Sequence, residues 1–284
     1  MDDKYYYEPV EIAEFTVKSA IRKADRSPIN TFLLAFLAGA FIAFAAEGSN
    51  MAAFNLFMKA DTYGLGKALA GAIFGTGLMM VVIAGGDLFT GNSLMIMGVL
   101  DKKIKLSEML KNWGIVYAGN FVGSLLIAIM MANSGLFKSG NFGLGAVTIK
   151  IASYKVGLTF VEALILGILC NWLVCIAVWM AYAAKDITGR ILAIFFPIWL
   201  FITSGFEHSI ANMYYIPAGI LGKANSDLAN AAIALGMTPD KLEHLNWSSF
   251  IMNNLIPVTL GNIIGGGLFV ASVYWYIYLR NKKN

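Results

Sequence analysis

Residues 85–92 read GGDLFTGN, and this polar stretch interrupts an apolar run that extends from about residue 69 to 100. A second polar stretch, SGFEHS at 204–209, interrupts another long run at about 189–219. Irregular polar backbone at membrane depth is tolerated only where protein or a water-lined cavity surrounds it. The two interruptions therefore predict a transmembrane bundle in which two broken helices line a pathway.

The composition agrees with a membrane protein. The chain has 284 residues, of which 58% are hydrophobic and 13% charged, and its mean hydropathy is +0.68. A soluble domain carries about 25% charged residues. The net charge of +4 is small, and the basic residues lie between apolar runs rather than in one stripe. Nucleic acid is therefore not expected as a partner.

Six runs are long enough to cross a bilayer, which requires roughly 20 mostly apolar residues. They lie near 31–55, 69–100, 110–132, 157–183, 189–219 and 250–279. The predicted fold class is an all-α integral membrane protein with six transmembrane helices in a lipid bilayer. Its second and fifth helices are predicted to be broken.

The basic residues predict the orientation of the chain. If successive spans cross the membrane in opposite directions, 14 of the 21 Lys and Arg residues lie on the same side of the membrane as the N-terminus. Cytoplasmic segments are enriched in these residues, so both termini are predicted to be cytoplasmic, and no Lys or Arg is expected within a span. No cleavable signal peptide is visible in the first 28 residues, so the first run is expected to direct insertion.

Residues 1–28 are predicted to form a cytoplasmic N-terminal segment, and residues 29–284 the six-span domain. Apolar residues recur at helical spacing over about 10–26. They are Val10, Ala13, Val17, Ala20 and Ala24. Pro9 suits the start of this helix, and Pro28 fits an end near Ser27. The helix is expected to lie on the cytoplasmic face of the bundle, and a role in gating is the alternative.

The chain also repeats itself weakly. Three pairs of patterns recur in the same order: Gly85-x-Asp87 with Asn92 and Gly205-x-Glu207 with Asn212; Asn112-x6-Gly119-Asn120-x-x-Gly123 and Asn254-x6-Gly261-Asn262-x-x-Gly265; Phe32-x6-Gly39 and Phe160-x6-Gly167. They predict two homologous halves, at about 29–150 and about 151–284. Each half holds three spans, so the second half is expected to be inverted relative to the first.

His208 is the strongest candidate for chemistry, because it is the only histidine in a predicted span and ionisable groups in membranes are usually functional. A neutral imidazole donates a hydrogen bond, and an imidazolium pairs with an anion or protonates it. We expect His208 to line the pathway; the alternative is a histidine that satisfies carbonyls at a helix end.

The two acids of the interruptions, Asp87 and Glu207, are expected to cap half-helices, where backbone N–H groups favour negative charge. A proton relay is the alternative. Asn92 and Asn212 are expected to satisfy free backbone groups at the same places. Thr90 supplies a hydroxyl in the first interruption, whose N–H groups suit a carboxylate or a similar anion.

Other candidates have two readings that the sequence leaves open. Asn171 lies mid-span, so it either joins helices or faces the pore. Lys155 either attracts anions to the outer mouth or is a solvated loop residue. Leu78, Leu88, Phe74, Phe201 and Phe89 flank the interruptions, where they either pack or form hydrophobic constrictions that strip water from an ion.

Cys170 and Cys175 are expected to be small buried hydrophobes, and the sequence predicts neither a metal site nor a cofactor. An intramembrane enzyme using Cys170, Cys175, Glu162 and His208 is a remote alternative. It lacks a nucleophile–base pairing at a recognisable spacing, so the chain is predicted not to be an enzyme.

Three stretches resemble signatures of the formate/nitrite transporter family. They are AGGDLFTGN at 84–92, GILCNWLVCIAVW at 167–179 and SGFEHSIANM at 204–213. The end of the chain, NLIPVTLGNIIGGG at 254–267, is most similar to the formate channel branch. The resemblance covers residues from about 30 to 280.

This resemblance implies an aquaporin-like protomer in a homopentamer of the bacterial cytoplasmic (inner) membrane, with one pore per subunit. It implies that Thr90 hydrogen-bonds His208. Leu78 and Leu88 would form the cytoplasmic-side constriction, and Phe74 and Phe201 the other. Further residues are implied to be tied to the central histidine: Lys155, Asn171, Glu207, Asn212 and Asn262. In the family, the N-terminal segment is linked to gating and to a cytoplasmic formate-producing enzyme.

The resulting hypothesis is a channel or transporter for formate or a similar small monovalent anion, passive or coupled to protons. Lys155 would draw the anion in, the constriction would remove water, and His208 would hydrogen-bond or protonate it. Nitrite and hydrosulfide remain alternatives on the same scaffold. A water or glycerol channel fits less well, because neither interruption contains Asn-Pro-Ala. An ammonium channel also fits less well, because it would be expected to have a second histidine within a span.

Overall fold

A computed structural model describes residues 5–283 of the chain. Residues 1–4 and 284, which belong to the predicted N-terminal segment and six-span domain, lie outside the described residues; Lys4, used above for the orientation, is one of them. Regular structure in the described part is helical, apart from one isolated β-bridge between Tyr6 and Ala184.

The prediction of six spans is confirmed: six helices in the described part are long and apolar enough to cross a membrane. They are α2 (Pro28–Phe57), α3 (Tyr63–Met79) with its π-helical continuation (Met80–Gly85), α6 (Leu106–Asn133), α8 (Phe160–Ala183), α9 (Ile187–Ser204) and a composite helix over Trp247–Tyr278. The composite helix joins α13 (Trp247–Ser249), α14 (Ile256–Ile263) and α15 (Val273–Tyr278) through two π-helical segments, Phe250–Leu255 and Ile264–Ser272.

Shorter helices complete the bundle. They are α1 (Pro9–Ala24), α4 (Phe89–Asn92), α5 (Ile96–Leu100), α7 (Gly143–Val156), α10 (Ser209–Gly222), α11 (Ser226–Ala234) and α12 (Pro239–His244), with 3-10 turns at Ser93–Met95, Leu136–Lys138 and Arg280–Lys283. α1 forms where it was predicted and buries Ala13, Val17 and Ala20. α7, α11 and α12 were not predicted, because each is too short for the length criterion that identifies a span.

Both predicted interruptions are present. Helix α3 with its π-helical end stops at Gly85, and the chain runs extended through Gly86 and Leu88 before α4 begins. Helix α9 stops at Ser204, and α10 begins at Ser209. Gly85 and Gly205 adopt φ values of +99° and +82°, which favour glycine because it lacks a Cβ atom. We call residues 85–88 break one and residues 205–208 break two.

Close contacts between helices depend on the glycines of the repeat. A Cβ atom on Gly123 would lie 2.0 Å from the Phe36 carbonyl oxygen, and one on Gly265 would lie 2.2 Å from the Ile168 carbonyl oxygen. Small residues thus let the backbones touch, as predicted. The contacts equate Phe36 with Ile168, so the match of Phe32-x6-Gly39 to Phe160-x6-Gly167 was one helical turn out of register. Phe and Gly recur in such helices by chance.

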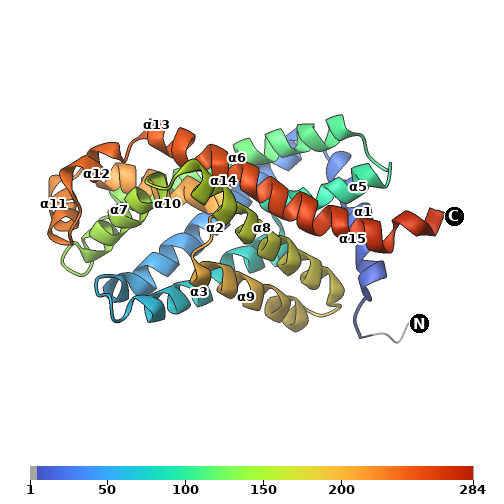
Figure 1. The fold of residues 1–284 in the computed structure, drawn as a ribbon, viewed down its shortest axis with the longest axis horizontal. Helices are drawn as coiled ribbons and strands as arrows, with labels where there is room; N and C mark the ends of the chain where they lie inside the picture. The colour runs from blue at the N-terminus through green and yellow to red at the C-terminus, as the bar shows by residue number, and fades with distance from the viewer. Residues whose placement is uncertain (1–4, 284) are drawn as a thin grey trace.

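Figure 1 shows α1 and α15 at one end of the molecule and α11 and α12 at the other. Because the chain crosses the bundle six times, α1 near its start and α15 near its end lie at the same end of the molecule. The expectation that spans hold no basic residue was wrong, because Lys67, Lys111 and Arg190 lie in the first two turns of α3, α6 and α9. Lys111 and Arg190 already lie inside the predicted runs 110–132 and 189–219, and Lys67 is included because α3 begins at Tyr63, before the run at about 69–100.

Candidate functional site between the two broken helices

His208 is buried where break two meets α10, and two hydrogen bonds hold its ring. Nδ1 accepts the Ala211 backbone N–H at 3.0 Å, and Nε2 lies 2.9 Å from Thr90 Oγ1. A backbone N–H can only donate, so Nδ1 is the unprotonated nitrogen and Nε2 carries the hydrogen. The fold therefore selects a neutral imidazole that donates from Nε2 to Thr90. The contact between Thr90 and His208 that the resemblance implied is present.

An aromatic pair adjoins the histidine. The Phe201 ring lies 6.0 Å from the His208 ring, and the Phe74 ring packs edge-on to Phe201 with centroids 5.7 Å apart. Leu78 and Leu88 are also buried. Phe89 has a different environment, because its ring packs against Trp113 and Tyr117 of α6. The structure thus brings Phe74, Phe201 and His208 together, and it places Phe89 with the packing of α6.

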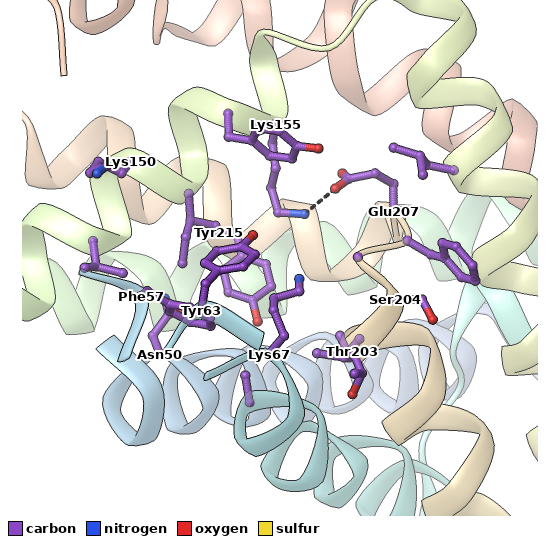
Figure 2. A pocket seen from close by; sticks show the side chains of 18 of the residues that line it. Asn50, Phe57, Tyr63, Lys67, Lys150, Lys155, Thr203, Ser204, Glu207 and Tyr215 are labelled. Carbon is purple, nitrogen blue, oxygen red and sulfur yellow. Dashed lines mark hydrogen bonds and ion pairs between the residues drawn. The ribbon is translucent and has the colours of Figure 1, made fainter. Parts of the chain in front are cut away.

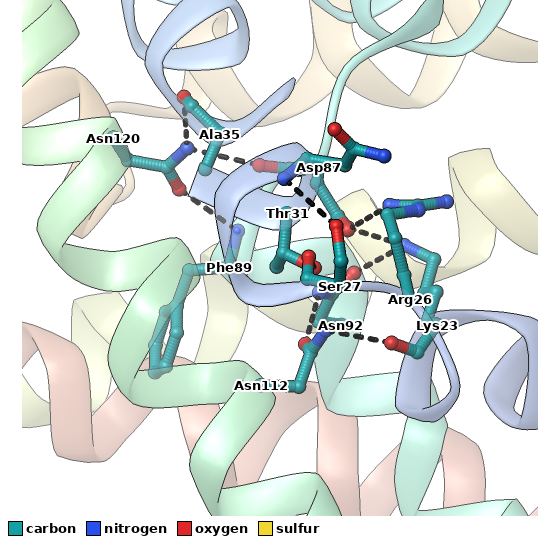
Figure 3. A network of polar contacts seen from close by, with 11 residues as sticks. Lys23, Arg26, Ser27, Thr31, Ala35, Asp87, Phe89, Asn92, Asn112 and Asn120 are labelled. Carbon is teal, nitrogen blue, oxygen red and sulfur yellow. Dashed lines mark hydrogen bonds and ion pairs between the residues drawn. The ribbon is translucent and has the colours of Figure 1, made fainter. Parts of the chain in front are cut away.

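At break one, Lys23 of α1 and Arg26, which follows this helix, pair with a buried acid. Asp87 is completely buried, and its carboxylate oxygens lie 2.7 Å from Lys23 Nζ and 2.6 Å from the Arg26 guanidinium. Lys23 also donates to Asn92 Oδ1. Figure 3 shows Lys23 and Arg26 converging on the acid. The prediction that Asp87 caps a half-helix was wrong, because Leu88 occupies the N-cap of α4 and the carboxylate turns to the cations.

At break two, one cation serves the acid. Glu207 Oε1 accepts from Lys155 Nζ of α7 at 2.7 Å, and Oε2 accepts from the side-chain amides of Asn212 and Asn254. The Glu207 side chain is 2% exposed and that of Lys155 12%. Glu207 does not cap α10 either, because His208 occupies the N-cap and caps with its own ring. Both acids lie one residue too early in the chain to act as caps.

Two buried asparagines hold the breaks in equivalent ways. Asn120 accepts the Phe89 N–H at 2.9 Å and donates to the carbonyls of Ala35 and Asp87. Asn262 accepts the Ser209 N–H at 2.9 Å. It donates to the carbonyls of Gly167 and Glu207. Each side chain thus replaces helical hydrogen bonds that the break removes. The repeated Gly-Asn motif contains this signal, which is used above as evidence of duplication. The resemblance implied a tie to the histidine for Asn262 but not for Asn120.

Further amides connect the site. Asn92 donates to Asn112 at 2.8 Å, and Asn212 donates to Asn254 at 2.7 Å. Asn171 lies mid-span and donates to the carbonyls of Thr90 and Asn262, at 3.2 and 2.6 Å. These contacts favour the interpretation of Asn171 as a residue that joins the two halves. The prediction that Asn92 and Asn212 satisfy free backbone groups was wrong. Their side chains bond to other side chains, of Lys23 and Asn112 in one case and of Glu207 and Asn254 in the other.

A cavity of about 690 Å³ opens beside break two. Its wall includes Lys67, Lys150, Lys155, Glu207 and Tyr215 (Figure 2). Lys155 therefore lines a cavity next to the break, and it is not a solvated loop residue. Lys67 was not singled out from the sequence, because it lies at the start of an apolar helix with no motif around it.

The remaining candidates are explained by packing. Cys170 and Cys175 are buried and unpaired, as expected for small buried hydrophobes. Glu162 accepts from the backbone and hydroxyl of Thr159 and so caps α8. Across residues 5–283, no group of three His, Cys, Asp or Glu side chains is arranged to hold a metal ion.

Six apolar helices, two of them broken and meeting at a buried histidine, define a membrane channel or transporter protomer. Comparison with known proteins identifies which kind. The sequence model of the family described as "Formate/nitrite transporter" matches residues 10–276, and the chain belongs to this family.

Individual relatives agree. The chain is 40% identical to "Formate channel FocA" of Escherichia coli (strain K12), over 97% of this chain and 96% of that protein. It is 40% identical to "Probable formate transporter" of Methanothermobacter thermautotrophicus, over 90% of this chain and 92% of that protein. A solved structure titled "Pentameric formate channel with formate bound" superimposes with a TM-score of 0.75 at 38% identity, covering 89% of this chain and 98% of that one.

Proposed function

We propose that this protein is a formate channel that works as a homopentamer in the bacterial cytoplasmic membrane, with both termini in the cytoplasm. The observation that carries the proposal is His208, held neutral by the Ala211 amide and placed against Thr90 between the two breaks. Formate is proposed as the substrate because relatives are described as formate channels, and the homopentamer is proposed because a similar solved structure is a pentamer with formate bound. The protein is not an enzyme in this proposal.

The proposed path runs through the groups described above. Formate enters the cavity beside break two, passes Phe74 and Phe201, meets His208 and Thr90, and leaves past Leu78 and Leu88. Asn171, Glu207, Asn212 and Asn262 keep the breaks in shape around this path. Apolar constrictions remove water, which disfavours a bare charge, so the anion needs a donor at the narrow part. The Thr90 hydroxyl hydrogen is the open donor there, and the His208 Nε2–H joins it when the anion replaces Thr90 Oγ1 as its acceptor.

The histidine is proposed to donate a hydrogen bond rather than its proton. Protonating the ring would require Nδ1 to release the Ala211 N–H, and an unpaired buried donor costs about 1–3 kcal/mol. Any proton that moves with formate then arrives with the anion and does not come from His208. The cytoplasmic formate-producing enzyme remains a predicted partner. In this orientation α1 and α15 lie at the cytoplasmic end of the molecule.

The first test is flux in proteoliposomes of the purified protein, with formate, nitrite and hydrosulfide compared at about pH 7 and about pH 5. Fast formate flux supports the proposal. Strong preference for nitrite or hydrosulfide keeps the architecture and the path but overturns the substrate.

The role of the histidine is tested by His208→Ala. Losing a hydrogen bond to a charged group lowers formate flux about tenfold or more. Wild-type flux with unchanged pH dependence in this variant would show that the proposed mechanism is wrong.

A further inference from the structure

Three lysines line the cavity beside break two: Lys67 of α3 and Lys150 and Lys155 of α7. Electrostatic attraction of an anion into this cavity depends on which of these charges is free to bind it. The sequence favoured Lys155, because it adjoins the fourth span. The contacts of the three ammonium groups give a different answer.

Two of the three lysines already have partners. Lys155 Nζ donates to Glu207 Oε1 at 2.7 Å, so its charge is neutralised by a carboxylate. Lys150 Nζ donates to the Leu235 carbonyl at 2.7 Å, which ties α7 to the end of α11. Within the described part of the chain, Lys67 Nζ has no hydrogen bond or ion pair. An ammonium group carries three donors, and those of Lys67 are available to a ligand.

The position of Lys67 is next to break two. Its Nζ lies 3.7 Å from the place that a Cβ atom on Gly205 would occupy. Figure 2 shows the side chain extending from α3 toward Lys155 and Glu207, while Thr203 and Ser204 lie on the neighbouring wall. Gly205 is three residues from His208 along the chain. An anion on Lys67 would therefore lie at the entrance to the histidine.

The backbone of break two offers little competition. The N–H groups of Gly205, Phe206 and Glu207 all donate to carbonyls, of Ile202, Phe201 and Leu166, at 3.0, 3.2 and 3.2 Å. These amides are therefore not free to bind an anion, although breaks in helices often use them for this purpose. Among the three lysines of this cavity wall, Lys150 and Lys155 each have a hydrogen-bond partner, whereas none of the three donors of Lys67 is used in the described part of the chain.

We propose that Lys67 forms the anion-binding site of this cavity, where a small monovalent carboxylate or oxyanion pairs with the ammonium before it reaches Phe201 and His208. The inference deepens the proposed function and rests on it. Lys155 then has a different task, which is to neutralise Glu207. Lys67 collects the substrate, and its charge matters most when the anion is scarce.

The test compares Lys67→Gln with Lys150→Gln in proteoliposomes. Both variants remove one positive charge from the same cavity and keep a hydrogen-bond donor, but only the first removes the open ammonium. Lys67→Gln is expected to lower formate flux about tenfold well below saturation and to leave flux at saturating formate close to wild type. Lys150→Gln is expected to resemble wild type throughout, and Lys67→Arg to retain most of the flux at low formate.

Three outcomes overturn the proposal. One is wild-type flux of Lys67→Gln at low formate. Another is an equal loss in Lys67→Gln and Lys150→Gln, which would mean that only the total charge of the cavity counts. The third is a loss at all formate concentrations together with a lower Tm, which would make Lys67 a structural residue.

Binding is measured separately from transport. Formate is expected to raise the Tm of the wild-type protein and of Lys150→Gln in detergent, because a ligand stabilises the state that binds it. A smaller shift is expected in Lys67→Gln, and an equal shift in all three proteins contradicts the site. If the wild type transports nitrite but not formate, the proposal of formate as substrate fails. The role of Lys67 is then tested separately, by repeating the flux and Tm comparisons with nitrite.

Discussion

Break one and break two are built from the same parts, but they differ in the residue that faces the centre. Asp87 corresponds to Glu207, Asn120 to Asn262, and Lys23 to Lys155, with equivalent hydrogen bonds around each. The residue after the acid is Leu88 in one break and His208 in the other. The framework of the two breaks is thus duplicated, whereas the imidazole is present only in break two.

The cations extend this comparison to the flanking helices. α1 supplies Lys23 to break one, and α7 supplies Lys155 to break two, so we infer that α7 is the first helix of the second half as α1 is the first helix of the first half. In this division the boundary lies before Gly143, a few residues earlier than the predicted boundary near residue 150. Break one has two cations on its acid, while break two has one, and a second lysine beside it faces the cavity.

The largest effect is expected where a single cation serves a buried acid. Lys155→Met leaves Glu207 without a cation, and breaking a buried pair in this way destabilises a protein by about 3–5 kcal/mol. Thermal unfolding in detergent measures the loss, with Lys155→Arg as the control that keeps the charge. A Tm equal to wild type in Lys155→Met would show that Glu207 does not need its partner.

The asparagines test whether the two frameworks are equivalent. Asn120→Ala and Asn262→Ala each remove three hydrogen bonds at a break. Each variant is expected to lose about 3 kcal/mol, because buried backbone groups are left unpaired. Similar losses of Tm in the two variants support equivalence. If only one variant loses stability, the hydrogen bonds of the other asparagine can be replaced by neighbouring groups, and the two frameworks are not equivalent.

Break one should tolerate the loss of one cation better than break two. Lys23→Met leaves Arg26 on Asp87, so the expected loss is about 2 kcal/mol, in the range for one hydrogen bond to a charged group. The double variant Lys23→Met with Arg26→Met should approach the loss seen in Lys155→Met. If the single variant already matches Lys155→Met in Tm, Arg26 contributes nothing to the pairing.

The smallest effect concerns the contact between the breaks. Thr90→Val removes the acceptor of His208 Nε2–H and is expected to cost about 1 kcal/mol, whereas Thr90→Ser keeps the hydroxyl. Formate flux is the sharper measurement, since the valine variant should fall while the serine variant stays near wild type. Equal flux in both would show that the hydroxyl is not part of the path.

The sequence was sufficient to predict the six spans and both breaks, because their signals are local. Apolar length identifies the spans, and GGDLFTGN and SGFEHS mark both breaks. His208 was also predictable as the single histidine of a span. Pairings between distant segments could not be predicted. Lys23 and Asp87 are 64 residues apart, and nothing near either residue specifies the other. Asp87 and Glu207 were assigned as caps because a polar side chain at a helix start usually has that role.

The order of the charged pairs along the chain has a consequence for how the protein is made. Lys23 and Arg26 precede Asp87, and Lys155 precedes Glu207, each within its own half. During synthesis and membrane insertion, Asp87 and Glu207 therefore each emerge after their cations have been translated. Each half can carry its carboxylate into the bilayer already paired with a cation, which avoids the cost of an isolated buried charge. Insertion of the first half then does not have to wait for the ribosome to finish the second.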